Sequence, residues 1–214
     1  MTSTRILDVA LPIFASRGFE ATSLDAVAAA AGCTKQTLLH HFRSKDGLLD
    51  AVLVVVAQEL AEAVEVGLSQ PEGEWERLDA VIGAVFRLAA RRPEVLSLVR
   101  EVGRLGTPFV DRLLSSLETL SQRAITFLRV GVARGVFRAH DHRLVLLSAY
   151  SSVVAAATEV ETLRQLGVTP GVRILVRRRR ALRDEVRAIL GFGVESLDRG
   201  TGSEGVVNGL DRAG

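Results

Sequence analysis

The segment Gly32–Lys45, with the sequence GCTKQTLLHHFRSK, gathers side chains that suit contact with a polyanion. It holds Lys35, Arg43 and Lys45 and no acidic residue, although the chain carries 25 acidic side chains against 27 lysines and arginines. Because positive side chains attract phosphate and release its counterions, this composition favours a phosphate-binding surface. The amide of Gln36 can also pair with the N6 and N7 edge of adenine, which makes this residue the strongest candidate for reading a base.

Three short helices are predicted to position this segment. Apolar residues at helical spacing predict a first helix that ends in a left-handed turn at Gly18, and Pro12 predicts a kink or a later start within it. Thr22 and Asp25 have the spacing of a capping box at the start of a second, alanine-rich helix. Thr34 is then the expected N-cap of the third helix.

Two helices joined by a short turn that contains glycine form the helix-turn-helix pattern. In this pattern the start of the second helix enters the major groove of DNA. The third predicted helix reads KQTLLHHF, and its Leu38 and Phe42 lie four residues apart on an inward face. Its first residues are small or polar, so they fit against bases and phosphates without clashing. We therefore predict a DNA-binding domain at residues 1–46.

The same residues resemble a known family. The stretch from Ile6 to Val52 is similar to the N-terminal domain of the TetR family of transcriptional regulators, in its phenylalanine-to-glycine helix end and in the motifs ATS, AxxAG, TLxxHF and SKDGLL. The resemblance implies a homodimer that binds a palindromic double-stranded DNA operator, most often as a repressor, and that a small-molecule effector releases. The residues that we expect at the DNA on this basis are Thr22, Ser23, Thr34, Lys35, Gln36, Thr37, Leu39, His40, Arg43 and Lys45.

Four residues depart from the pattern of that family. Leu39 stands where tyrosine is usual, Gln36 replaces glycine or alanine, Cys33 replaces valine, and Pro12 is uncommon. The departures at Leu39 and Pro12 motivate an alternative function, which is a helical ligand-binding module of the same fold that has lost DNA recognition.

The rest of the chain is expected to form a larger helical domain. Apolar residues at helical spacing, broken by glycine and proline, predict an all-α chain of about nine helices. We assign residues 47–192 to a ligand-binding and dimerisation domain and residues 193–214 to a disordered tail. Two predicted helices, His142–Gln165 and Val172–Leu190, are dimer candidates, because small residues permit close helix approach and a two-fold interface needs a self-complementary surface.

A ligand pocket is expected within this second domain. Bulky apolar walls with a few charged anchors are typical of such pockets, and core packing beside a charged helix face is the alternative for each residue. The candidates are Trp75, Phe86, Arg100, Glu101, Arg104 and Phe109. No cofactor is expected.

The histidine pairs could suggest metal binding and the single cysteine could suggest redox sensing, but a structural role is favoured for each. His40–His41 and His140–His142 lack a full tetrahedral ligand set, so no metal site is predicted. In the family pattern His41 packs on the helix-turn-helix core while His40 points outward. Cys33 is a redox candidate by its place near a helix start, but a packing role is favoured.

The run Arg177–Arg180 cannot form one groove-binding stripe, because four consecutive residues point almost all round a helix. In the same helix Leu175, Leu182, Val186 and Ile189 define an apolar face. A solvated or ion-paired arginine face is therefore favoured over a membrane-surface or second nucleic-acid role.

Several classes of protein are disfavoured by what the sequence lacks. We find no nucleophile and base set, no glycine-rich phosphate loop and no multi-carboxylate metal motif, so an enzyme is not expected. With one cysteine, no export signal and no apolar stretch near the roughly 20 residues of a membrane span, a cytoplasmic location without a membrane partner is expected.

Overall fold

The computed structural model describes residues 3–69, 73–158 and 172–191, and within them the chain forms ten helices and no strand. The helices are α1 (Ser3–Arg17), α2 (Leu24–Ala31), α3 (Lys35–Phe42), α4 (Lys45–Leu68), α5 (Glu74–Arg91), α6 (Pro93–Leu105), α7 (Thr107–Ser116), α8 (Glu118–Ala133), α9 (His142–Thr158) and α11 (Val172–Leu190). The all-α prediction is confirmed. The predicted helix count missed the break at Leu117, which separates α7 from α8 with no glycine or proline to mark it.

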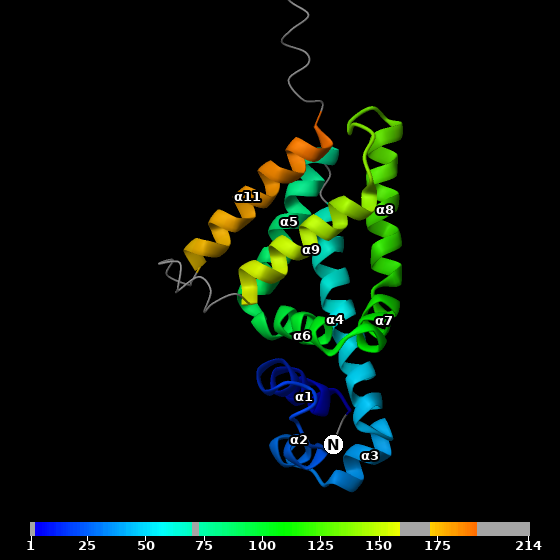
Figure 1. The fold of residues 1–214 in the computed structure, drawn as a ribbon, viewed down its shortest axis with the longest axis vertical. Coiled ribbons are helices and arrows are strands. Elements are labelled where there is room, and N and C mark those ends of the chain that lie inside the picture. Colours follow the sequence, from blue (N-terminus) through cyan, green and yellow to red (C-terminus); the bar gives the residue numbers. More distant parts are fainter. Residues whose placement is uncertain (1–2, 70–72, 159–171, 192–214) are drawn as a thin grey trace, which may run out of the picture.

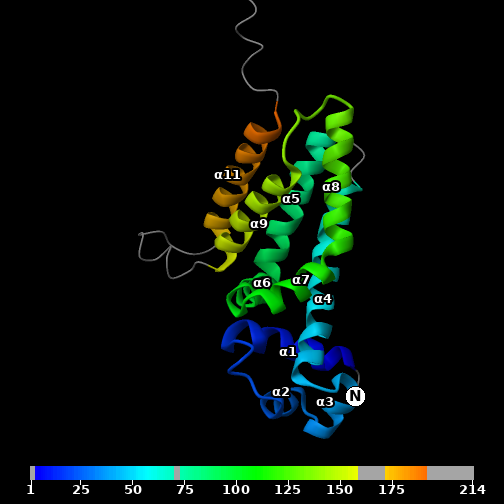
Figure 2. The ribbon, with the colours of Figure 1, turned by 45° about the vertical axis from the view of Figure 1, so that its right-hand side comes forward.

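The helices form a small N-terminal head and a larger bundle that α4 connects (Figure 1). Helices α1 to α3 lie together at one end of the molecule, and α11 lies toward the other end (Figure 2). One core cluster joins α1, α2, α3 and α4 to α6, with fully buried Phe14, Leu38, Leu49 and Leu98 among its members. A second cluster joins α5, α8, α9 and α11. The head therefore packs on the bundle through α6 as well as continuing into it through α4.

Helix α1 runs without a break through Pro12, so a later helix start is wrong. Proline removes the N–H that would bond to the carbonyl of Asp8, but both residues lie on the exposed face, where water can satisfy that carbonyl. The hydroxyl of Ser16 donates to the carbonyl of Pro12 at 2.7 Å. The helix ends as predicted at Gly18, whose φ is 87°.

The start of α2 corrects the predicted capping residue. Ser23 is the N-cap, and its Oγ accepts the N–H of Ala26 at 3.1 Å. Thr22 is only 3% exposed, and its hydroxyl donates to the carbonyl of Gly18 at 2.7 Å. The cap thus lies one residue later than predicted, because the chain folds Thr22 into the turn after α1.

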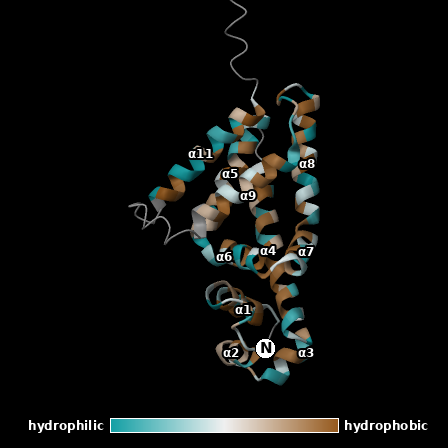
Figure 3. Cartoon of the chain, viewed as in Figure 1, coloured by the Kyte–Doolittle hydropathy of each residue, from teal (hydrophilic) through white to brown (hydrophobic). Residues whose placement is uncertain are grey.

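Helix α11 has the apolar face that its spacing predicted. Leu182 and Val186 are buried against the second core cluster, whereas hydrophilic residues cover the outer side (Figure 3). Arg179 pairs with Asp79 of α5 at 3.3 Å, and Arg183 pairs with its neighbour Asp184 at 3.2 Å. The arginine run therefore contributes partly to packing between helices.

His140 and His142 contact each other at the start of α9. The Nδ1 atom of His142 lies 2.9 Å from Nε2 of His140, where the chain enters the helix. Among the residues that the structure describes, no three His, Cys, Asp or Glu side chains gather as metal ligands would.

Two sequence predictions fall partly or wholly outside the described residues. The second half of the first dimer candidate, at 159–165, is one of them, and the tail at 193–214 is the other. None of the described helices combines the length and the apolar character that a membrane span requires.

Candidate DNA-binding surface

The turn between α2 and α3 fixes where the second helix of the pair begins. Gly32 adopts a left-handed conformation, with φ 72°, that a side chain would strain. The N–H of Cys33 then donates to the carbonyl of Ala28 at 2.9 Å, while its half-buried side chain packs on the core. Thr34 caps α3 as predicted, because its Oγ1 accepts the N–H of Thr37 at 3.1 Å. These local bonds aim the start of α3 away from the bundle.

The predicted DNA-contacting residues differ in how far they reach solvent. Six have exposed positions, three are half-buried, and Thr22 is buried. The exposed ones are Ser23, Thr34, Lys35, Gln36, His40 and Arg43, and the half-buried ones are Thr37, Leu39 and Lys45. The burial of Thr22 removes its side chain from the surface that DNA could touch.

Lys35 has an acidic partner that the sequence did not reveal. Its Nζ lies 2.8 Å from Oδ2 of Asp25, ten residues earlier, and the two side chains are 51% and 66% exposed. An ion pair in such exposed positions contributes little stability. The lysine can therefore exchange this carboxylate for a phosphate at small cost.

Arg43 occupies an unusual backbone conformation at the end of α3. Its φ is 62°, the only positive φ of a residue other than glycine in the part of the chain that the structure describes. The next residue, Ser44, caps α4 by accepting the N–H of Gly47 at 2.9 Å. The connection from α3 to α4 is therefore tight, and it leaves the guanidinium of Arg43 on the exposed side.

Lys45 is held within the head rather than projecting freely. Its Nζ donates to the carbonyl of Glu20 at 3.1 Å and lies 4.5 Å from the ring centre of Phe19. This cation stabilises the turn between α1 and α2, so any phosphate contact by Lys45 would come in addition to a structural role.

One expectation about α3 is wrong. His41 is exposed and does not pack into the helix-turn-helix core; its ring lies 5.7 Å from that of His40 and 6.0 Å from that of Phe42. Leu38 is fully buried and Phe42 is half-buried, as predicted. The reason is the helical period, because Leu38 and Phe42 already occupy the inward face of this eight-residue helix.

Three of the six predicted ligand residues lie instead at the junction of head and bundle. Glu101 of α6 accepts the N–H of Phe19 at 3.1 Å and two bonds from Arg104, each at 2.9 Å. Phe109 packs edge-on against Phe19, with ring centres 5.4 Å apart. These contacts join α6 and α7 to the turn after α1, so they position the head on the bundle.

The other three predicted ligand residues lie away from this junction. Trp75 and Phe86 pack within the second core cluster, where Trp75 meets Phe137 edge-on at 5.0 Å. Arg100 is exposed on α6. Helical spacing alone could not predict this separation, because it depends on how α5 and α6 cross.

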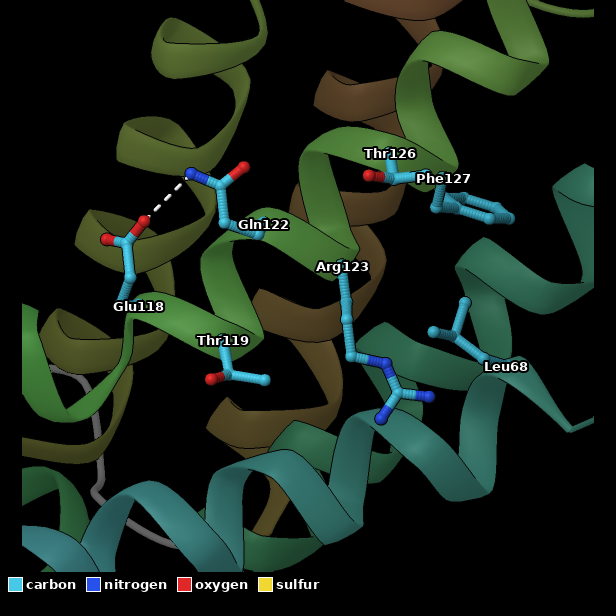
Figure 4. A pocket seen from close by; sticks show the side chains of 7 residues that line it. All are labelled: Leu68, Glu118, Thr119, Gln122, Arg123, Thr126 and Phe127. Carbon is cyan, nitrogen blue, oxygen red and sulfur yellow. Dashed lines mark hydrogen bonds between the residues drawn. The ribbon is translucent and has the colours of Figure 1, made fainter.

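A surface groove of about 570 Å³ lies between the end of α4 and α8. Figure 4 shows Leu68 facing Arg123 and Phe127, while Glu118 and Gln122 share a hydrogen bond on the other side of α8. Its lining residues are Leu68, Glu118, Thr119, Gln122, Arg123, Thr126 and Phe127, none of which was predicted from sequence. Arg123 also pairs with Glu65, which ties α8 to α4.

The junction carboxylate gives a testable pH dependence. The pKa of Glu101 is lowered below its ordinary value of 4.5, chiefly by the hydrogen bonds from Arg104 and also by the Phe19 N–H, although burial opposes this. Because the charged form is favoured in the folded state, its stabilisation is complete above about pH 4.5 and is lost as the pH falls through the lower folded-state pKa. The head and bundle should therefore separate more easily in acid.

We expect Glu101→Gln to lower the Tm at pH 7 by about 2–4 °C, since it loses the charge-assisted bonds to Arg104. The difference from the wild type should shrink as the pH falls below 4.5, where the wild-type carboxyl becomes neutral too. Thermal unfolding followed by circular dichroism between about pH 3 and 7 would measure this, with the exposed Asp111→Asn as control. If the difference in Tm between the wild type and Glu101→Gln stays constant with pH, the charge of Glu101 does not stabilise the junction.

Taken together, the capped turn, the acid-free start of α3 and the helical bundle define a helix-turn-helix regulator. Residues 6–52 match the family model described as "Bacterial regulatory proteins, tetR family". Residues 6–52 thus carry the N-terminal domain of this family, and the chain is similar to its transcriptional regulators.

Known relatives agree with this assignment. The chain is 44% identical to the HTH-type transcriptional repressor KstR2 of Rhodococcus jostii over 50 residues, which is 23% of this chain and 24% of that protein. It is 29% identical to KstR2 of Mycolicibacterium smegmatis over 135 residues, 62% of this chain and 66% of that protein. Both alignments thus span less than two thirds of the relative's length. These relatives are transcriptional regulators, not enzymes.

The fold is shared over most of the chain. The structure of the transcriptional regulator FadR from Bacillus subtilis, solved in complex with stearoyl-CoA, superposes with a TM-score of 0.73 at 18% identity. The match covers 86% of this chain and 97% of FadR. At this identity the likeness establishes the arrangement of helices and no more.

Proposed function

We propose that the chain is a homodimeric one-component regulator, a repressor, that binds a palindromic DNA operator through α3 and releases it when a small molecule binds the bundle. The observation that supports DNA binding best is the start of α3, where Thr34, Lys35 and Gln36 are all exposed on a rigidly capped helix. Side chains at this point of a helix-turn-helix reach base edges in the major groove.

The proposed contacts follow from exposure and chemistry. Gln36 reads a base through its amide, and Lys35 and Arg43 bind phosphates. Thr34, Thr37 and His40 lie beside them, and Ser23 sits at the start of α2, where its backbone can approach a phosphate. Leu39 and Lys45, which are half-buried, remain proposed DNA contacts at the edge of this surface. Thr22 is no longer proposed, because its side chain is buried.

Dimerisation is proposed through α9 and α11, which pack against each other. Helix α9 carries three large apolar side chains in exposed positions, Leu144, Leu147 and Tyr150. A cluster of this kind is more typical of an interface than of a solvated surface. A two-fold dimer would place two copies of α3 about 34 Å apart, which matches successive major grooves on one face of DNA.

The effector is proposed to be hydrophobic or amphipathic. FadR from Bacillus subtilis, which shares this fold, was solved in complex with stearoyl-CoA, and another similar structure is that of the ketosteroid transcriptional regulator KstR2 of Mycobacterium tuberculosis. The stearoyl-CoA complex supports a large apolar ligand for this fold. The groove between α4 and α8 has the size of a small-molecule site and combines Phe127 and Leu68 with Arg123. Because α4 leads directly to the head, a ligand there that favours a different spacing of the heads would weaken DNA binding, and DNA would weaken ligand binding equally.

The first experiment is selection of the purified full chain against random double-stranded DNA at about 150 mM salt, which suppresses weak electrostatic binding. Enrichment of a palindrome would support the proposal and supply the operator. If no sequence is enriched at this or lower salt, the alternative function gains support, namely a ligand-binding module without DNA recognition. That alternative is motivated by Leu39, which is half-buried where the family has tyrosine, and by Pro12, and the internal bonds of Lys45 also favour it.

Replacing Gln36 by alanine is expected to relax base preference at one position of each half-site, lowering discrimination there by about 10-fold. Affinity for a site already mismatched at that position should change little, because the lost amide was not paired there. Competition binding with single-base operator variants measures this, with the exposed Arg17→Ala as control. An unchanged preferred sequence would show that another residue reads the base.

A further inference from the structure

The turn after α1, residues 18–20, lies between a charged side chain of the bundle and a charged side chain of the head. From the bundle, Oε1 of Glu101 on α6 accepts the N–H of Phe19 at 3.1 Å. From the head, Nζ of Lys45 donates to the carbonyl of Glu20 at 3.1 Å and lies 4.5 Å from the centre of the Phe19 ring. Two successive residues of one short turn thus connect Glu101 to a lysine that is proposed to contact DNA.

Phe19 links these two charges rigidly. Its side chain is 6% exposed, and its ring packs edge-on against Phe14 and Phe109, with ring centres 5.4 Å apart in each case. A Cβ on Gly18 would come within 2.9 Å of Oε1 of Glu101, so the carboxylate lies directly against the backbone of the turn. A close-packed ring cannot turn independently of the backbone that carries it, and Glu101 holds that backbone. The carboxylate therefore fixes where the ring, and with it the cation, can lie.

Lys45 keeps donor capacity for a ligand outside the protein. An ammonium group carries three N–H donors, and the contacts of Lys45 in the described part of the chain use one of them, on the carbonyl of Glu20. A lysine that is already held in place loses less side-chain freedom on binding a phosphate than one that moves freely. The contacts with Phe19 and Glu20 therefore preorganise Lys45 rather than withdraw it from DNA.

We propose that Glu101 is a positioning residue for DNA binding, which acts through Phe19 to hold the ammonium of Lys45 where a phosphate can reach it. Arg104 assists, because it donates two bonds to the Glu101 carboxylate, each at 2.9 Å. Its guanidinium also lies 3.7 Å from the exposed carboxylate of Glu20, so it partly neutralises an acidic group next to the proposed phosphate contact. This inference rests on the proposed DNA-binding function and assigns part of it to a residue of the bundle.

A double-mutant cycle on operator affinity tests this link. Lys45→Ala is expected to weaken binding about 10-fold and to lower the slope of log affinity against log salt by about one, because one phosphate contact is lost. Glu101→Ala should weaken binding about 5-fold and lower the slope as well, but in the Lys45→Ala background it should change affinity by less than about 2-fold. Glu101→Gln, which keeps an oxygen for the Phe19 N–H, should recover part of the affinity.

Fluorescence anisotropy with labelled operator between about 50 and 300 mM salt would measure these quantities. Glu74→Ala is the matched control, since Glu74 forms a similar pair with Arg134 at 2.7 Å, at the end of the bundle far from the head (Figure 1), and its loss changes the net charge equally. This control should keep the wild-type affinity and slope. Circular dichroism at the assay temperature shows whether each variant is folded, and Glu101→Gln replaces Glu101→Ala in the cycle if the latter is not.

The outcomes separate this inference from the function on which it rests. If the wild type enriches no operator, the proposed DNA binding fails and this inference fails with it. If the wild type binds an operator but Glu101→Ala weakens binding equally in the wild-type and Lys45→Ala backgrounds, the carboxylate acts by placing the whole head, and its link to Lys45 is wrong. Wild-type affinity in either single variant would also overturn the proposal, because then the lysine makes no phosphate contact or the carboxylate does not position it.

Discussion

Lys35→Ala/Arg43→Ala is expected to weaken DNA binding by about 100-fold and to reduce the slope of log affinity against log salt by about two. Each exposed cation is proposed to neutralise one phosphate, and each lost contact removes about one released counterion. Lys35 gives up only an exposed pair with Asp25 when it binds, so little of its contribution is offset. Fluorescence anisotropy with labelled operator between about 50 and 300 mM salt would measure both quantities.

The matched control removes two exposed arginines from the bundle, as Arg91→Ala/Arg129→Ala, with the same change in net charge. This control should keep the wild-type salt slope, because long-range attraction is screened beyond about 8–10 Å at these salt concentrations. If both double variants lose affinity equally, the effect would be one of overall charge, and the assignment of Lys35 and Arg43 to phosphate contacts would be wrong. The Tm of both variants should match the wild type, since the replaced side chains are exposed.

Gly67→Ala is expected to destabilise the chain by about 2 kcal/mol or more. Gly67 lies near the end of α4, and a Cβ there would come within 2.5 Å of the backbone N and Cα of Val81 in α5. A backbone cannot yield as a flexible side chain does, so the two helices would have to separate. Urea unfolding of the wild type and the variant would give the free-energy difference.

Gly103→Ala supplies a control with the opposite expected sign. Gly103 lies inside α6, and a Cβ there would find only the hydroxyl of Tyr150, at 3.8 Å. Alanine in an open helical position stabilises by about 1 kcal/mol relative to glycine. If both substitutions shift the unfolding midpoint in the same direction, the close approach of α4 and α5 would not explain the glycine at position 67.

The close approach of α4 and α5 at Gly67 also affects where the head lies relative to the bundle. Helix α4 connects the head to the bundle, and its packing on α5 sets the direction in which it leaves the bundle (Figure 2). A shift at Gly67 should therefore also move the head and alter the spacing between the two copies of α3 in the proposed dimer.

The sequence alone determined the local structure of the head. The helix end at Gly18 and the cap at Thr34 both agree with prediction. Each depends on bonds within three or four residues or on backbone freedom at one glycine, and such signals are complete within a short window. The residues of the proposed DNA surface stay predictions that rest on the start of α3 and on the family resemblance, and Thr22 leaves the set because its side chain is buried.

Only the tertiary structure decided which faces meet. The pair of Lys35 with Asp25, the exposure of His41, and the placement of Glu101 at the junction of head and bundle involve contacts between different helices or competition for one inward face. Helical periodicity shows that a side chain lies on an apolar or polar stripe, but the crossing of helices depends on side chains far apart in the chain. The groove beside Arg123 arises in this way, because α4 and α8 come together from segments about 60 residues apart.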